Sequence, residues 1–436
     1  MGPHKGGAVR FSDLNGWLRW QNTLNQRTID LGLDRVRRVW ERLGSRRLPC
    51  PVITVGGTNG KGSCVAMLEA IYRAAGYRTA SYNSPHLLRY TERIRFGGEE
   101  VGEEALCGAF DRVDRARGDI PLTFFEFGTL AALDLCLRWA PDVAILEVGL
   151  GGRLDAVNLV DPDVAMVTTI ARDHMIWLGE TLDAIACEKA GIFRHGRPAI
   201  IGSRTTPAAL RGRAQEVGAQ VYQLGQEFDA GQAVGGWQWQ AAGAAPLALP
   251  LPALRGSFQL DNAAAVVMAV SGLLQRLPVP IGAMRQGLQR VRLAGRFQVL
   301  PGEPTLILDV AHNGQAAESL AANLRAFPCR GRRHAVLGVL RDKAVAEILA
   351  PLTSLFATWD LGQSEDQRAL PVADLEAAVA GATAAGGAAE RASIFAHGII
   401  AEALHAARDR AEAGDCVVVF GSFTTVEEAL RGADLA

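Results

Sequence analysis

Short, almost uninterrupted apolar runs alternate with longer stretches of helical spacing along most of the chain. Four such runs, each typical of a strand that is buried on both faces of a sheet, are residues 51–55, 143–148, 163–170 and 198–202. Apolar side chains recur at helical spacing in residues 61–76 and 127–140. This alternation predicts an α/β fold with an open, mostly parallel sheet and helices on both faces.

The alternation weakens between about residues 203 and 255. Trp237 and Trp239 alternate with polar residues in this stretch, and several prolines follow them. This pattern predicts a small peripheral β element. Helical spacing returns at residues 258–274.

A second α/β unit begins near residue 297. Its strand-like runs are residues 305–310, 334–339 and 416–420. Because 436 residues are too many for one ordinary core, two domains are expected. We place the boundary near Arg296, which gives a larger domain over residues 1–296 and a smaller, Rossmann-like α/β domain over residues 297–436.

Composition and charge narrow the possible functions. A net charge of -1 does not favour nucleic acid or an anionic membrane surface as a partner. The seven cysteines are scattered and never spaced C-x-x-C, which is typical of a reducing cytosol and argues against a zinc site. The beginning of the chain lacks the apolar core of a signal peptide, and no apolar run is long enough to span a membrane. We therefore expect a cytoplasmic protein.

A glycine-rich segment, V-G-G-T-N-G-K-G-S at residues 55–63, lies between the first predicted strand and a predicted helix. It departs from the common phosphate-loop pattern G-x-x-x-x-G-K-[ST], because Val55 replaces the first glycine and the hydroxyl comes one residue late, at Ser63. Glycines let backbone N–H groups approach phosphate oxygens, and Lys61 would neutralise the outer phosphates. This context favours phosphate binding over a plain glycine-rich turn with a solvated lysine.

Several polar residues follow the other predicted strands. Glu147 ends one of them, at the sheet edge where such folds bind ligands, and its carboxylate suits Mg²⁺. An ion pair with Arg153 is the alternative for Glu147, and Asp155 can face either a metal or a substrate. Position alone favours a structural role for His174. Lys189 resembles an exposed helix lysine. Its chemistry alone argues against a metal-binding role, because an ammonium group cannot ligate a cation.

The second unit supplies three further candidates. Asp309 ends a predicted strand, and His312 follows three residues later. The Asp309 carboxylate can accept a hydrogen bond from a ribose hydroxyl, or it can cap the following helix. Arg296 can reach a phosphate or form a surface ion pair. Together these features indicate ATP, Mg²⁺ and a cleft between two domains. The sequence lacks the hydrolase motifs G-x-S-x-G and H-E-x-x-H and the protein-kinase motif H-R-D, so these two classes have no support.

Nine motifs occur in order along the chain: GTNGKGS, SPHLLRYTERIR, FFEFGTLAAL, ILEVGLGGRLDAVN, DHMIWLG, EKAGIF, FQLDNAA, GRF and DVAHN. This order resembles the folylpolyglutamate synthase and dihydrofolate synthase family, which belongs to the Mur-ligase-like, ATP-dependent amide-forming enzymes. The resemblance extends from residues 28–36 to residues 421–423 and accounts for the unusual spelling of the phosphate loop.

The resemblance implies an ATP site and two Mg²⁺ sites. The residues implied to bind ATP, with Asn262 reading the adenine, are Thr58, Asn59, Gly60, Lys61, Gly62, Ser63, Asn262, Arg296, Asp309 and His312. The implied metal ligands are Ser84 and Glu147 for one ion and His174 and Lys189 for the second, with Lys189 carbamylated by CO₂. A carbamate is an anionic oxygen ligand, unlike an ammonium group. The resemblance also allows a monovalent cation, and it gives Lys61, Glu147, His174 and Lys189 catalytic importance.

The resemblance also implies a pterin site formed by three segments. They are Ile29, Asp30 and Leu31; Thr123, Phe124, Phe125 and Glu126; and Leu154, Asp155 and Ala156. Aromatic faces and a carboxylate suit a flat ring that carries amino groups.

The implied activity is the ATP-dependent addition of L-glutamate to dihydropteroate and to tetrahydrofolates through an acyl phosphate, catalysed by a monomer. An enzyme with only one of these two activities stays open, as does a cell-wall ligase that adds an amino acid to a nucleotide-linked peptide. A protein that uses ATP only as a switch is the alternative from another class, but it would need neither a second metal site nor a pterin-like pocket.

Overall fold

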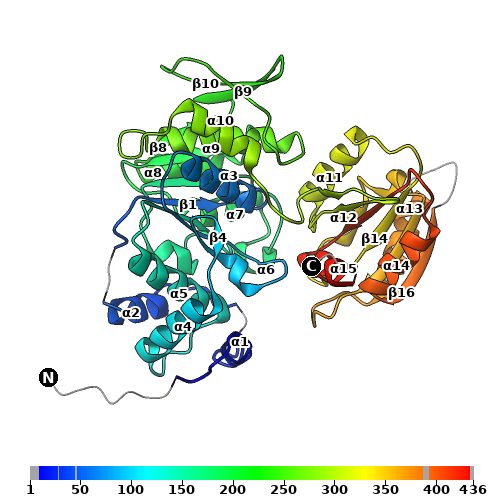
Figure 1. Cartoon of the computed structure of the whole chain (residues 1–436), viewed down its shortest axis with the longest axis horizontal. Coiled ribbons are helices and arrows are strands. Elements are labelled where there is room, and N and C mark those ends of the chain that lie inside the picture. The colour runs from blue at the N-terminus through cyan, green and yellow to red at the C-terminus, as the bar shows by residue number, and fades with distance from the viewer. Residues whose placement is uncertain (1–8, 28, 45–46, 386–391, 433–436) are drawn as a thin grey trace.

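The computed structural model describes residues 9–27, 29–44, 47–385 and 392–432 of the chain. Its elements form two bodies side by side, the larger from the first two-thirds of the chain and the smaller from the last third (Figure 1). Within these residues the strands form sheets of eight, three and six strands. Both large sheets are mostly parallel, which confirms the predicted α/β fold class.

The eight-stranded sheet has the strand order β4-β3-β2-β5-β1-β6-β7-β8. Its strands are β1 (Val52–Gly56), β2 (Thr79–Tyr82), β3 (Ile94–Phe96), β4 (Glu99–Glu100), β5 (Val143–Glu147), β6 (Val164–Val167), β7 (Pro198–Ile201) and β8 (Gln220–Gln223). Six neighbouring strands run parallel, in the order β2, β5, β1, β6, β7 and β8, whereas β3 and β4 pair antiparallel at one edge. The four strands predicted from apolar runs are confirmed as β1, β5, β6 and β7.

Alternate residues of these strands face two separate cores. Ile53 and Val55 of β1 point into the first core, whereas Ala144 and Leu146 of β5 point into the second. The helices over the first core are α3 (Lys61–Ala74), α9 (Phe258–Ser271) and α10 (Ile281–Arg290). Those over the second are α1 (Leu14–Gln21), α2 (Asp34–Arg42), α4 (Glu103–Arg117), α5 (Phe124–Trp139), α7 (Leu182–Ala190) and α8 (Ala208–Glu216). Burial on both faces explains why these strands are apolar throughout.

The small antiparallel sheet confirms the predicted peripheral β element. Its strands are β9 (Phe228–Ala233), β10 (Gly236–Ala241) and β11 (Leu247–Leu249). Trp237 and Trp239 of β10 point to the same face and are buried against the first core. The indole N–H of Trp239 donates to the carbonyl of Ala264 in α9 at 3.2 Å, which joins the small sheet to this helix.

The six-stranded sheet has the order β12-β13-β17-β14-β15-β16 and carries the smaller body. Its strands are β12 (Gln298–Leu300), β13 (Thr305–Leu308), β14 (Arg333–Leu337), β15 (Thr358–Gln363), β16 (Ser393–Ile399) and β17 (Cys416–Phe420). One face is covered by α11 (Gly314–Ala326), α12 (Val345–Leu349) and α13 (Val372–Ala385), and the other by α14 (Ile400–Arg410) and α15 (Phe423–Gly432). The division of the chain at residue 296 stays a proposal, which the start of this sheet at Gln298 supports.

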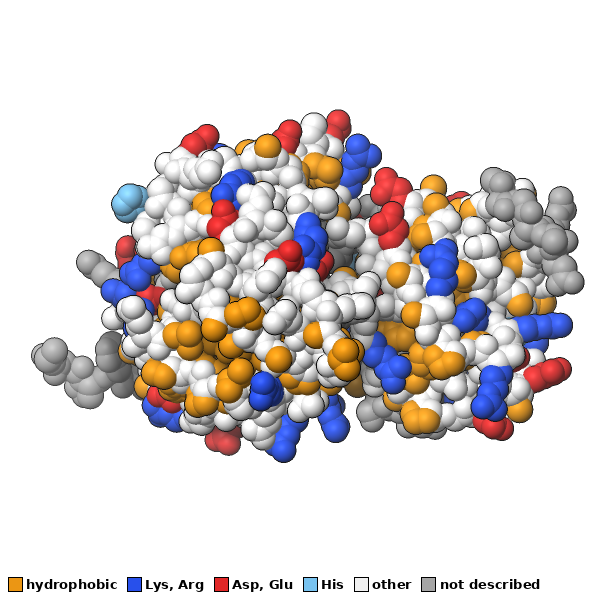
Figure 2. All heavy atoms as spheres, turned by 90° about the horizontal axis from the view of Figure 1, so that it is seen from above, with side chains coloured by type: hydrophobic (Ala, Val, Ile, Leu, Met, Phe, Trp, Pro, Cys, Tyr) orange, Lys and Arg blue, Asp and Glu red, His pale blue; other side chains and the backbone are white. Residues whose placement is uncertain are grey.

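Short helical turns connect these elements: η1 (Tyr90–Arg93), η2 (Ala156–Leu159), α6 (Met175–Leu178) and η3 (Thr353–Leu355). On the face seen from above, basic, acidic and apolar side chains are interspersed over both bodies (Figure 2). Among the helices described, none combines the length and the apolar character needed to cross a membrane.

Candidate active site

A pocket of about 550 Å³ is lined by residues of both bodies. The loops that follow β1, β5 and β6 supply one part of its wall, and the loops that follow β13, β14 and β17 supply another part. The predicted site residues that line it are Ile29, Asp30, Leu31, Thr58, Asn59, Gly60, Lys61, Gly62, Ser84, Thr123, Phe124, Phe125, Glu126, Glu147, Leu154, Asp155, Ala156, His174, Lys189, Arg296 and His312. The structure thus brings together residues that lie far apart in the sequence, many of them at the carboxyl ends of parallel strands.

The glycine-rich loop packs so tightly that two of its glycines have no room for a side chain. Gly57 has a φ of 135°, and a β-carbon there would lie 1.9 Å from Oγ1 of Thr168. Gly60 has a φ of 89°, and a β-carbon there would lie 2.7 Å from Oδ1 of Asn262. The loop leads into the N-terminus of α3, which has no side-chain cap. Its first N–H groups are therefore available to an anion in the pocket.

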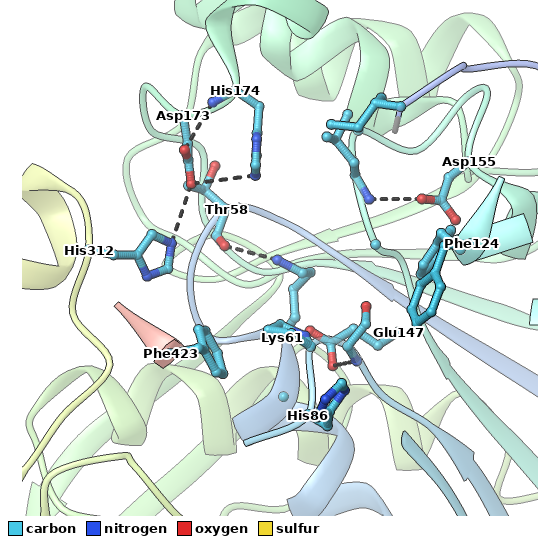
Figure 3. Close-up of a pocket in the computed structure, with 18 of the residues that line it drawn as sticks. Thr58, Lys61, His86, Phe124, Glu147, Asp155, Asp173, His174, His312 and Phe423 are labelled. Atoms are coloured by element: carbon cyan, nitrogen blue, oxygen red, sulfur yellow. Dashed lines mark hydrogen bonds and ion pairs between the residues drawn. The ribbon is translucent and has the colours of Figure 1, made fainter. Parts of the chain in front are cut away.

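Lys61 folds back over the same loop. Its Nζ atom donates to the carbonyl of Thr58 at 3.0 Å (Figure 3). It also donates to the carbonyl of Gly57 at 3.2 Å. Burial lowers the pKa of Lys61, and the nearby Glu147 carboxylate opposes that shift. An ammonium group held beside free backbone N–H groups suits the outer phosphates of a nucleotide.

Glu147 is a buried carboxylate with little protein compensation. Its Oε2 atom accepts one long hydrogen bond, from the backbone N–H of Ser84 at 3.3 Å. Burial raises the pKa of Glu147, while Lys61 acts in the opposite direction. The Glu147 carboxylate and the Ser84 hydroxyl are hard oxygen donors, so the pair fits Mg²⁺. The described part of the chain contains no group of three His, Cys, Asp or Glu side chains placed to hold a metal, so phosphate and water oxygens would have to complete the coordination.

His174 and Lys189 lie on the pocket wall beside this pair. His174 adopts a left-handed backbone with a φ of 52°, and burial lowers its pKa to about 4, so its ring is neutral at pH 7 and keeps a lone pair for a metal. The Nζ atom of Lys189 donates to the carbonyl of Gly57 at 2.9 Å. Burial lowers the pKa of Lys189 to about 7, so much of the amine is neutral near that pH.

The predicted pterin segments form an aromatic and acidic wall. Thr123 caps α5, and the Glu126 carboxylate accepts from the Thr123 N–H at 2.8 Å. Arg35 of α2 joins this wall to the preceding loop, because Nη2 lies 2.9 Å from Glu126 Oε1 and Nη1 lies 2.8 Å from Asp30 Oδ2. Asp155 accepts from the backbone N–H groups of Leu150 at 2.8 Å and Val157 at 2.9 Å. Burial raises the pKa of Asp155 to about 6.

Three residues predicted to bind ATP do not line the pocket. The Ser63 hydroxyl accepts from Nε2 of Gln259 at 3.1 Å, and Nδ2 of Asn262 donates to Oε1 of the same glutamine at 3.0 Å. The two carboxylate oxygens of Asp309 accept from the N–H groups of Phe297 and Ala311. These side chains brace the loop and the junction between the bodies, and their contacts with ATP stay predictions.

The sequence reasoning missed several residues of the pocket wall, among them His86, Arg93, Asp173, Lys343 and Phe423. His86, Arg93 and Asp173 lie inside quoted motifs, and Asp173 directly precedes His174. Lys343 and Phe423 follow β14 and β17, so their position after a strand was the available signal. The ring of Phe423 lies 5.2 Å from the guanidinium carbon of Arg296 and 6.1 Å from the ring of His312.

The fold and the site define a Mur-ligase-like protein. The model of the Mur ligase middle domain matches residues 55–270, and the model of the Mur ligase glutamate ligase domain matches residues 295–423.

Individual relatives narrow this class. The dihydrofolate synthase/folylpolyglutamate synthase of Escherichia coli is 43% identical over 424 residues, 97% of this chain and 96% of that protein. The enzyme of the same name from Haemophilus influenzae is 40% identical over 384 residues, 82% of this chain and 86% of that protein. The chain belongs to the dihydrofolate synthase/folylpolyglutamate synthase family of ATP-dependent ligases.

Solved structures agree with this assignment. The Escherichia coli protein in complex with DHPP and ADP superposes with a TM-score of 0.90 at 42% identity, over 97% of this chain and 98% of that one. A bifunctional folylpolyglutamate synthase/dihydrofolate synthase with Mn, AMPPNP and L-glutamate bound gives a TM-score of 0.89 at 40% identity, over 99% of this chain and all of that one.

Proposed function

We propose that the chain adds L-glutamate to dihydropteroate, which gives dihydrofolate, and to tetrahydrofolates, which lengthens their glutamate tail. The observation that carries this proposal is the meeting of the phosphate loop, Glu147 and the Phe124–Phe125 wall in one pocket. The relatives support both activities, because they carry the names of both enzymes and one solved relative binds ADP together with DHPP.

The first chemical step activates the carboxylate of the pteroyl substrate. A carboxylate oxygen attacks the γ-phosphorus of ATP, the bond to the bridging oxygen breaks, and ADP leaves with the electron pair. The product is an acyl phosphate. Lys61 and the free N–H groups at the start of α3 stabilise the negative charge of the transferring phosphoryl group.

The second step forms the amide. The amino group of L-glutamate attacks the acyl carbon, the bond from that carbon to the phosphate oxygen breaks, and phosphate leaves with the electron pair. The nitrogen then loses a proton to solvent. Lys343 and Arg368 of the smaller body also line the pocket, but their charges are already paired with Asp173 and Asp366.

Two Mg²⁺ sites complete the proposal. Ser84 and Glu147 would hold one ion, and His174 and Lys189 would help to hold the other. When bound, Mg²⁺ neutralises charge on the phosphoryl oxygens. The neutral amine of Lys189 adds CO₂ and releases a proton, which leaves an anionic carbamate as the ligand. A monovalent cation nearby is a further part of the expectation from the family resemblance.

Water must be kept from the acyl phosphate, so we propose that the two bodies close over the pocket. Contacts between them support this. Nδ2 of Asn59 in the phosphate loop donates to Oδ1 of Asn313 at 3.0 Å and to Oε1 of Gln315 at 2.7 Å. Closure would bring Arg296, Asp309 and His312 toward the nucleotide.

Glutamate-dependent ADP release by the purified protein tests the function. Dihydropteroate, a tetrahydrofolate and a nucleotide-linked cell-wall precursor are supplied in turn. Release with the first two is expected. Release with only one of those two would show a single activity, and release only with the nucleotide precursor would contradict the proposal. A monomer in the cytoplasm also stays a prediction, for which light scattering and fractionation are the measurements.

A further inference from the structure

Arg93 is a buried cation on the pocket wall. It ends η1, follows the Ser84–His86 loop, and is only 9% exposed. Neither the phosphate-loop residues nor the three pterin segments include it, so its presence in the pocket needs a reason of its own.

The contacts of Arg93 hold its guanidinium group firmly but leave most of its donors free. Nε donates to Nδ1 of His86 at 2.8 Å. The guanidinium carbon lies 5.0 Å from the ring centroid of Tyr90 and 5.5 Å from that of Phe124. Within the described residues no carboxylate pairs with Arg93, and its two terminal nitrogens have no hydrogen-bond partner. A buried cation without a directly paired carboxylate is costly, so this arrangement suits an anion that arrives with the substrate.

The position of Arg93 decides which anion fits. Lys61, the loop N–H groups and Arg296 are the cationic or donor groups beside the phosphate loop. Arg93 instead contacts Phe124 of the aromatic wall, and its charge acts on Glu147, which ends β5. It therefore stands between the wall that suits a flat ring and the site of phosphoryl transfer.

We propose that Arg93 binds the carboxylate of the pteroyl substrate, the group that ATP activates. The two terminal nitrogens of a guanidinium group match the two oxygens of a carboxylate, and such a pair fixes orientation as well as charge. Stacking against Tyr90 and Phe124 fixes the plane of the fork in advance. This role rests on the proposed function and adds to it a residue that selects acids over neutral pteroyl compounds.

The test compares two ligands, dihydropteroate and the same molecule with a carboxamide in place of the carboxylate. Binding is measured with ADP present, for the wild-type protein, Arg93→Gln, and the control Arg89→Gln. Arg89 is 62% exposed at its side chain and pairs with Glu100. The wild type and the control are expected to prefer the carboxylate by roughly 10- to 100-fold, and Arg93→Gln is expected to bind both ligands about equally. A wild type without this preference, or an Arg93→Gln variant that keeps it, contradicts the proposal.

Two further measurements close the alternatives. Unchanged ADP and AMPPNP affinity in Arg93→Gln is expected, whereas a loss of AMPPNP affinity with the carboxylate preference intact would assign Arg93 to the nucleotide phosphates. Arg93→Lys keeps the charge without the fork and decides the matter if the glutamine variant does not fold: its preference must fall at least about 5-fold. Glutamate-dependent ADP release by the wild type is measured on the same preparation. If the wild type releases no ADP, both the proposed function and this inference are wrong. If it releases ADP but Arg93→Gln keeps the preference for the carboxylate, only this inference is wrong.

Discussion

The Nζ atom of Lys343 lies 2.8 Å from Oδ1 of Asp173, and this ion pair joins the smaller body to the loop after β6. Both side chains are more than nine-tenths buried, at 7% and 9% exposed. Nε2 of His312 lies 3.6 Å from the other carboxylate oxygen of Asp173. The two bodies therefore meet at a buried cluster of charged and polar side chains, and all three of its members line the pocket.

Replacing one member of this pair should destabilise the protein strongly. Lys343→Met leaves the Asp173 carboxylate buried without its cation, so we expect a loss of about 3 kcal/mol in the free energy of unfolding. The double variant Lys343→Met/Asp173→Asn should lose less than the sum of the single variants, which thermal or urea unfolding measures. Arg213→Gln removes an exposed pair with Glu216 and should change stability by less than about 1 kcal/mol. Additive losses would show that the pair does not couple the bodies.

Arg35 should control the affinity for the pteroyl substrate without changing the affinity for ATP. Arg35→Gln frees the Glu126 carboxylate and the Asp30 loop, so we expect KM for dihydropteroate to rise roughly 10-fold while KM for ATP stays unchanged. Arg37→Gln, on the same helix but paired with the exposed Asp34, is the matched control. Equal effects of the two substitutions on KM would show that the contacts of Arg35 with Glu126 and Asp30 do not control substrate affinity.

The phosphate loop should not tolerate a β-carbon at Gly57. Gly57→Ala combines a φ of 135° with an overlap at Thr168, so we expect it to lose at least about 2 kcal/mol of stability or of AMPPNP binding energy. Calorimetry and thermal unfolding measure both quantities. Gly212→Ala in α8 is the control, because no atom lies within 4 Å of the added carbon there. Normal nucleotide affinity and stability in Gly57→Ala would show that the loop has room for a β-carbon at this position.

Carbamylation of Lys189 is open to a direct spectroscopic test. With ¹³C-labelled bicarbonate, the wild-type protein should show a carbamate carbon resonance that is missing in Lys189→Ala. Removing CO₂ should also lower the rate of ADP release. A spectrum without the resonance at saturating bicarbonate would leave the second metal site without its anionic ligand.

Lys61 and Glu147 should be essential to phosphoryl transfer but not to folding. Lys61→Ala removes the cation beside the phosphate loop, and Glu147→Ala removes the proposed metal ligand, so each should abolish ADP formation. Circular dichroism and thermal unfolding should show an intact fold in both variants. Near-normal turnover in either of them would refute its assigned role.

The central strands could be predicted because their environment is uniform. β1, β5, β6 and β7 lie between two layers of helices, so every position is apolar and the run stands out. β2, with the sequence T-A-S-Y, is equally buried but half polar, and its Ser81 hydroxyl donates to the buried Glu69. No local pattern distinguishes such a strand from a loop.

The site likewise has residues that the sequence could predict and residues that it could not. The phosphate loop could be found from its glycines and from its place between a strand and a helix. Arg93 could not, because its contact with Phe124 forms only when the larger body folds. Lys343 and Phe423 could be placed after predicted strands but not beside the phosphate loop, because that depends on how the two bodies meet. The sequence suggested a ligand-facing Asp155, but it could not reveal that backbone N–H groups already occupy both of its carboxylate oxygens.

The most direct test of the whole account is the mass of the product. The protein is incubated with ATP, Mg²⁺, L-glutamate and either dihydropteroate or a tetrahydrofolate, with Lys61→Ala as the control, and the pteridines are analysed by mass spectrometry. A product heavier than its acceptor by one glutamyl residue, formed from both acceptors by the wild type and by neither in the variant, is the expected result. If neither acceptor gains that mass with the wild-type protein, the pocket does not join glutamate to a pteroyl acid and the account is wrong.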